Sequence, residues 1–195
     1  MTLHVATFTH YTDNSGRADS TIEDEFHRVE IIEHSFPVSE QIIFYYFVQG
    51  AFHFVPEGSV LTPILLFPAS SDKPYTSDTA ADLRIALGLV LQDERNWWIS
   101  SDLEIVDVTF HDGHADIVLQ GEYSGESDEV LVAARMQILL TVFANPAVQT
   151  ATVTLNGDTI GNLGVSNSTD AKPADYVYTR AEMETYIKEH AYVLP

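Results

Sequence analysis

The sequence predicts an α+β fold in which an antiparallel or mixed sheet packs on two main helices. Three observations predict it: an amphipathic period over residues 79–92, an apolar stretch over residues 128–144, and Asp-Gly and Asn-Gly turns between β-rich runs. We expect an N-terminal β-hairpin arm and a short C-terminal helix around this unit. The chain then divides into residues 1–38, 39–165 and 166–195.

The N-terminal part of the chain predicts strands. Residues 26–36 are β-rich and end at Pro37, so they complete the predicted arm. Residues 41–48 are rich in β-branched and aromatic side chains, which favour a strand. Residues 60–67 contain Pro63 and therefore predict an edge strand or an extended connection, followed by a polar loop over residues 68–78.

The first predicted helix runs from about Thr79 to Gln92. Thr79 and Asp82 have the spacing of a capping box, with aspartate in place of glutamate. Apolar residues then recur at the helical spacing that places them on one buried face. These residues are Leu83, Ala86, Leu87 and Val90.

A hairpin is predicted around Asp112-Gly113, because both residues tolerate the positive φ angles of a two-residue turn. This turn pairs His111 with His114. The register also places Val106 opposite Leu119, with one face of the hairpin in the core and the other largely polar.

The second predicted helix spans residues 128–144 and has a single charge in its body, Arg135. A helix that is apolar nearly all round is buried on most sides. Residues 148–155 then alternate as a strand and turn at Asn156-Gly157. Thr179, with Glu182 three residues later, predicts the start of a short helix that ends near His190.

Charge and composition exclude several function classes. The 195 residues include 29 acids and 9 bases, a net charge of −20, which excludes nucleic-acid binding through a basic groove and disfavours anionic membrane surfaces. The chain has no cysteine, so disulfides, thiolate metal sites and thiol nucleophiles are excluded. We expect no transmembrane helix, and residues 1–5 lack the basic and apolar regions of a signal peptide.

Two residue pairs are candidate sites. His111 and His114 face each other across the predicted turn and could share a metal ion with Asp112 or Asp116; the alternative is a pair of exposed histidines at a hairpin tip. Trp97 and Trp98 follow the first predicted helix and form either a ligand platform or part of the core. No phosphate loop, nucleophile elbow or zinc-protease motif occurs, so we expect neither a catalytic residue nor a cofactor.

The order of these motifs resembles the GerMN domain, also called the sporulation and spore germination domain. The resemblance covers about residues 40–165, roughly two-thirds of the chain. The segments that carry it are Ile43-Phe-Tyr-Tyr-Phe47, residues 86–91, the hairpin of residues 103–119, residues 136–141, Asn145-Pro-Ala-Val148 and Val153-Thr-Leu-Asn-Gly157.

The resemblance implies a non-catalytic α+β module linked to spore-envelope assembly and protein contacts. It also implies an extracytoplasmic or envelope location, although the chain has no cysteine for a lipid anchor. We therefore expect a non-enzymatic binding or assembly module with a protein or cell-wall partner. The alternatives are a small carboxylate-dependent hydrolase with Trp97 and Trp98 at its cleft, or a divalent-cation-binding domain.

Overall fold

The structure is a computed structural model that describes residues 29–31, 35–49, 64–93, 102–123, 128–165 and 171–191. The elements within these ranges, in chain order, are β1 (Val29–Ile31), β2 (Gln41–Gln49), β3 (Ile64–Pro74), α1 (Thr79–Gln92), β4 (Glu104–His111), β5 (His114–Gln120), α2 (Asp128–Ala144), β6 (Thr150–Leu155), β7 (Asp158–Thr159), a 3₁₀ turn (Ile160–Asn162), β8 (Tyr178–Thr179) and α3 (Arg180–His190).

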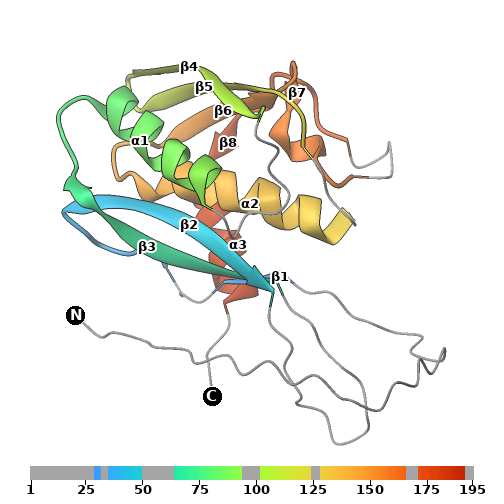
Figure 1. Ribbon diagram of the computed structural model, residues 1–195, viewed down its shortest axis with the longest axis horizontal. Coiled ribbons are helices and arrows are strands. Elements are labelled where there is room, and N and C mark those ends of the chain that lie inside the picture. The colour runs from blue at the N-terminus through green and yellow to red at the C-terminus, as the bar shows by residue number, and fades with distance from the viewer. Residues whose placement is uncertain are drawn as a thin grey trace, which may run out of the picture.

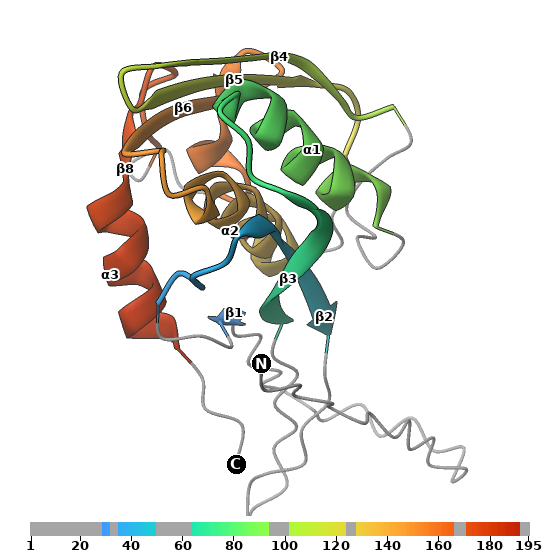
Figure 2. The same ribbon diagram turned by 90° about the vertical axis from the view of Figure 1, so that its left-hand side faces the viewer.

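The strands form two separate sheets, and the α+β prediction is confirmed. The first sheet has the order β1-β3-β2, and the second has the order β4-β5-β6-β7 with β8 also paired to β6. Both sheets are mixed: β1 lies parallel to β3, and β5 lies parallel to β6 across the α2 crossover. Helices α1 and α2 lie between the two sheets, and α3 flanks α2 at one side (Figures 1 and 2).

The position of α2 between two sheets explains its composition. Twelve of its 17 residues are buried, as the apolar sequence predicts. Two of the buried residues, Gln137 and Thr141, are polar. Both bind the backbone of β2: the Thr141 hydroxyl accepts from Tyr45 N at 2.9 Å, and Gln137 Nε2 donates to Tyr45 O at 2.8 Å. The helix therefore satisfies an edge of the first sheet that would otherwise be buried without partners.

Strand β3 corrects two predictions for the same stretch of chain. It lies in the middle of the first sheet, not at an edge, and it continues to Pro74 through most of the predicted polar loop. Pro63 lies outside the described residues, and Pro68 lies within β3 opposite Tyr45, beyond the three residues that pair with β1. Pairing with β2 over almost its full length holds the polar half of β3 extended.

The hairpin of β4 and β5 has the predicted turn, with positive φ at both Asp112 and Gly113. His111 pairs with His114 as predicted. The register changes farther from the turn, where Leu119 pairs with Ile105 and a bulge displaces Val106. The predicted core position of Val106 is therefore wrong, and its side chain is 47% exposed.

Replacing Gly113 with alanine tests the strain in this turn. The φ of Gly113 is +82°, and an added Cβ would meet only Gln149 and Ala147 at ordinary distances, so the cost is conformational. We expect a loss of about 1 kcal/mol in the free energy of unfolding, measured by urea titration. Gly88→Ala is the matched control: it lies in α1 with no atom near the added Cβ, and alanine there should stabilise by about 0.5–1 kcal/mol. Equal effects of the two changes would contradict this account.

Helix α1 has the predicted bounds but a different cap. Asp78, one residue before the predicted Thr79, accepts a hydrogen bond from Ala81 N at 3.0 Å. The carboxylate of Asp82 instead accepts from the backbone and hydroxyl of Thr76. Asp82 is therefore buried by the chain that leads into the helix, not by a capping box.

The cap of α3 is the one that the sequence predicts. Thr179 Oγ1 accepts from Glu182 N at 3.2 Å, and Glu182 Oε2 accepts from Thr179 N at 2.7 Å. The Tyr176 hydroxyl donates to the other carboxylate oxygen, Oε1, at 2.5 Å. Burial raises the pKa of Glu182, but these hydrogen bonds outweigh it and lower the pKa below the ordinary value.

This lowered pKa predicts a pH dependence of stability. A carboxyl group whose pKa is depressed by folding stabilises the protein above its unfolded pKa, and the contribution disappears as the pH falls through the folded value. The difference in Tm between the wild type and Glu182→Gln should therefore be largest near neutral pH and shrink in acid. Thermal unfolding from neutral to acidic pH measures this difference. A constant difference would contradict the role of the ionised carboxylate.

Strand β1 and the residue that follows α3 meet beside the first sheet. Ile31 of β1 forms a parallel bridge to Ala191, and Ile31, Met183 and Ile187 belong to the same hydrophobic core as α2. Residues 1–28 lie outside the described residues, and the division at residues 38 and 165 stays a prediction. In the part of the chain that the structure describes, no helix is long and apolar enough to cross a membrane.

Candidate functional site

The predicted histidine pair lies on the β4–β5 hairpin beside Asp116. His114 Nε2 lies 3.2 Å from Asp116 Oδ1, and His111 Nε2 lies 3.9 Å from Asp116 Oδ2. His114 Nδ1 also lies 2.8 Å from Thr150 Oγ1 of β6. The described residues contain no group of three or more histidine and carboxylate side chains that could hold a metal ion. The metal-binding role of His111 and His114 therefore stays a prediction.

The predicted aromatic platform lies elsewhere in the chain. Trp97 and Trp98 fall within residues 94–101, which are outside the described residues. Their role as a ligand platform or as core residues stays a prediction.

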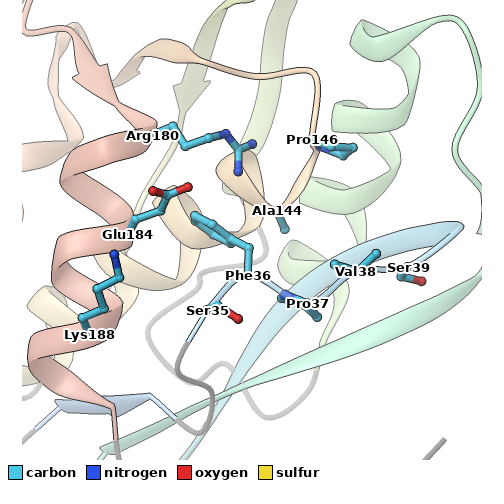
Figure 3. Close-up of a pocket in the computed structure, with 10 residues that line it drawn as sticks. All are labelled: Ser35, Phe36, Pro37, Val38, Ser39, Ala144, Pro146, Arg180, Glu184 and Lys188. Atoms are coloured by element: carbon cyan, nitrogen blue, oxygen red, sulfur yellow. The ribbon is translucent and has the colours of Figure 1, made fainter.

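A cleft lies on one face of α3, which we call the α3 cleft (Figure 3). Its volume is about 430 Å³. Three segments far apart in sequence form it: residues 35–39, the end of α2 with the turn that follows, and α3. Its lining residues are Ser35, Phe36, Pro37, Val38, Ser39, Ala144, Pro146, Arg180, Glu184 and Lys188.

Arg180 builds the inner wall of the α3 cleft. Its Nη2 donates to the carbonyls of Phe143 and Asn145 at 2.7 and 2.6 Å, and its Nε donates to Val148 O at 2.8 Å. The guanidinium therefore satisfies carbonyls that the end of α2 leaves without intrahelical partners. It also lies 5.1 Å from the centre of the Phe36 ring. Burial lowers the pKa of Arg180, which starts high enough that the group stays charged.

The rim of the α3 cleft combines charge with exposed apolar surface. Glu184 and Lys188 follow Arg180 at spacings of four residues, so all three lie on one face of α3 (Figure 3). Val38 faces them from the opposite segment and is fully exposed. The cleft thus carries two cations and one carboxylate in a chain whose net charge is −20.

Sequence reasoning missed this cleft because its walls come from three distant segments. One signal in the sequence points to it: residues 166–195 hold three of the nine basic residues. A scarce basic residue in a strongly acidic chain is a marker for a local charge requirement.

Comparisons with known proteins give two similar solved structures. No protein-family model and no curated protein matches the chain. One similar structure, at 2.5 Å, is a Clostridium perfringens protein provisionally described as a lipoprotein: it is 11% identical, with a TM-score of 0.36, over 75% of this chain and 95% of that one. The other is the tandem GerMN domains of the sporulation protein GerM from Bacillus subtilis: it is 18% identical, with a TM-score of 0.32. This chain covers 44% of that protein, and the match spans 69% of this chain. These low scores do not assign the chain to a family.

Proposed function

We propose that the chain is a non-enzymatic binding module of the cell-envelope or spore-related type, and that the α3 cleft receives an acidic segment of a partner protein. The envelope setting rests on the motif order that resembles the GerMN domain. The docking site rests on one observation: a cleft with a surplus of positive charge in a chain of net charge −20. Charge complementarity of this kind selects the partner and its register.

The chemistry of the cleft suits a peptide. Lys188 is a mobile point charge at the rim, where it can meet a carboxylate. Val38 and Pro146 supply apolar surface across the cleft from Lys188 for a neighbouring side chain of the peptide (Figure 3). Arg180 holds the far wall in place through its three carbonyl contacts, so the cleft is formed before the partner arrives.

The hydrolase alternative has less support at this cleft. Glycoside hydrolysis uses two carboxyl groups on either side of the scissile bond. Among the described residues that line the α3 cleft, Glu184 is the single carboxylate. A binding role therefore accounts for the lining better than an acid–base pair does.

Peptide display tests the proposal directly. A phage library of random dodecapeptides is panned on the purified protein, and enriched peptides are synthesised for calorimetry. We expect enriched peptides to carry aspartate or glutamate beside an apolar residue. Their affinity should fall at least tenfold in Lys188→Glu, because the rim charge is reversed. Lys73→Glu, which makes the same change at an exposed position of β3 that does not line the cleft, is the matched control and should leave affinity unchanged.

Two outcomes would overturn the proposal. The first is that no peptide is enriched, or that enriched peptides bind Lys188→Glu as tightly as the wild type. The second is co-sedimentation with purified peptidoglycan that depends on Lys188, which would make the partner a cell-wall polymer instead of a protein. Val38→Asp is a second variant for the same measurement of peptide affinity, since this exposed position accepts aspartate without unfolding the protein.

A further inference from the structure

A second pocket lies on a different face of α3, between this helix and α2. We call it the α2–α3 pocket; its volume is about 660 Å³, within the usual range for small-molecule sites. Its apolar wall comes from Val132, Met136 and Leu139 of α2 and Met183 of α3. The residues of α3 that line it differ from the Arg180, Glu184 and Lys188 face of the α3 cleft.

Arg135, the single charge in the body of α2, lines this pocket. Its Nη1 donates to Gly161 O at 2.6 Å and lies 3.5 Å from Leu163 O. Its Nε and Nη2 have no hydrogen-bond acceptor among the described residues, and no carboxylate of that part of the chain pairs with it. Burial lowers the pKa of Arg135, which still leaves it protonated at neutral pH. A guanidinium with donors to spare therefore lines an apolar pocket.

Lys172 brings a second cation to the same pocket. Its backbone is fixed by two hydrogen bonds to the Asn162 side chain, at 2.8 and 3.0 Å. Its ammonium group lies 3.5 Å from the centre of the Tyr176 ring, and no carboxylate of the described residues forms an ion pair with it. Gly161 lies next to both side chains: its carbonyl accepts from Arg135, and an added Cβ would lie 2.9 Å from Lys172 Cδ.

Two carboxylates also line the pocket, those of Glu182 and Asp128. Both oxygens of Glu182 accept the hydrogen bonds of the α3 cap described above. Asp128 stands at the first residue of α2 and has an interaction of its own. The pocket thus holds two of the six basic residues of the described part of the chain: Lys172 attracts the Glu182 carboxylate and helps to lower its pKa, while Arg135 has no carboxylate partner among the described residues.

We infer that the α2–α3 pocket binds a small organic anion, with a carboxylate or phosphate head on an apolar stem. Arg135 and Lys172 receive the head, since a guanidinium presents paired donors that suit both groups and an ammonium adds a point charge. The stem lies along Val132, Met136 and Met183. This site is separate from the α3 cleft, so the proposed peptide docking can fail while the anion site stands.

The methionines provide a direct readout of binding. The chain has three, Met1, Met136 and Met183, and two of them line the pocket. The protein is labelled at the methionine methyl groups and titrated with octanoate, octyl phosphate and octanol. We expect octanoate or octyl phosphate to shift the Met136 and Met183 methyl signals with saturation, while Met1 stays in place. The stronger of the two anions identifies the head group, and octanol should bind at least tenfold more weakly.

Two variants test whether Lys172 binds the anionic head group of the ligand. Lys172→Met keeps both backbone hydrogen bonds to Asn162 and should weaken anion binding at least tenfold. Lys73→Met removes the same charge from β3 and should leave anion binding unchanged. Calorimetry measures both, and thermal unfolding verifies that Lys172→Met is folded. The inference is overturned if neither anion shifts Met136 and Met183, if octanol binds as well as the anions, or if Lys172→Met binds like the wild type.

Discussion

Replacing Thr141 with valine is expected to lower the free energy of unfolding by about 2 kcal/mol, although the two side chains have the same shape. Thr141 is fully buried, and its hydroxyl accepts the Tyr45 N–H of strand β2 at 2.9 Å. Valine fills the same space but removes the Thr141 oxygen that accepts from this buried N–H. In a protein of this size, 2 kcal/mol corresponds to a fall in Tm of about 4–8 °C.

Gln137 makes the complementary contact to the same strand residue. Its amide donates to Tyr45 O at 2.8 Å, and Gln137→Leu should also cost about 2 kcal/mol. Both side chains bind the backbone of Tyr45 and lie one turn apart on α2, so the two losses are not independent, and the double variant measures the coupling between them. Thr109→Val is the matched control, since Thr109 is only partly buried on β4, and it should stay within about 0.5 kcal/mol of the wild type. Urea titration measures all four proteins. If Thr141→Val and Thr109→Val had equal effects on the free energy of unfolding, the contacts of α2 with the Tyr45 backbone would not stabilise the fold.

These contacts show which parts of the fold the sequence could predict. The bounds of α1 and α2, the turn at Asp112-Gly113 and the cap at Thr179 all follow from residues within a few positions of one another. The contact of Thr141 with Tyr45 joins residues 96 positions apart, so no local pattern contains it. The same reason explains why the sequence alone predicts an edge position for β3: its central position depends on β1, which pairs with only its first three residues.

The candidate sites also differ in whether the local sequence predicts them. The pairing of His111 with His114 was predicted because the turn alone determines it. The α3 cleft and the α2–α3 pocket are assembled from segments that approach only when α3 packs against α2. Composition contained part of the information: four of the six described basic residues, Arg135, Lys172, Arg180 and Lys188, line these two hollows. Only the structure shows which segments these four residues lie beside.

Arg180→Met is expected to destabilise the protein by about 2–3 kcal/mol. The guanidinium donates to the carbonyls of Phe143, Asn145 and Val148, which join the end of α2 to the start of β6. Methionine keeps the apolar stem of the side chain but removes every donor, so these partly buried carbonyls lose their charged partner. Because α3 holds α2 through this residue, the loss also loosens the packing of α3.

Two further variants separate the geometry of Arg180 from its charge. Lys cannot place one donor fork on three carbonyls, so Arg180→Lys should recover only part of the lost stability. Arg84→Met removes an arginine whose side chain is 44% exposed and paired with Asp107 on the surface, and it should cost less than about 1 kcal/mol. Thermal and urea unfolding of the three variants give the comparison. If Arg180→Lys were as stable as the wild type, charge alone would account for the role of Arg180, and the three-carbonyl contact would not be what joins α3 to α2.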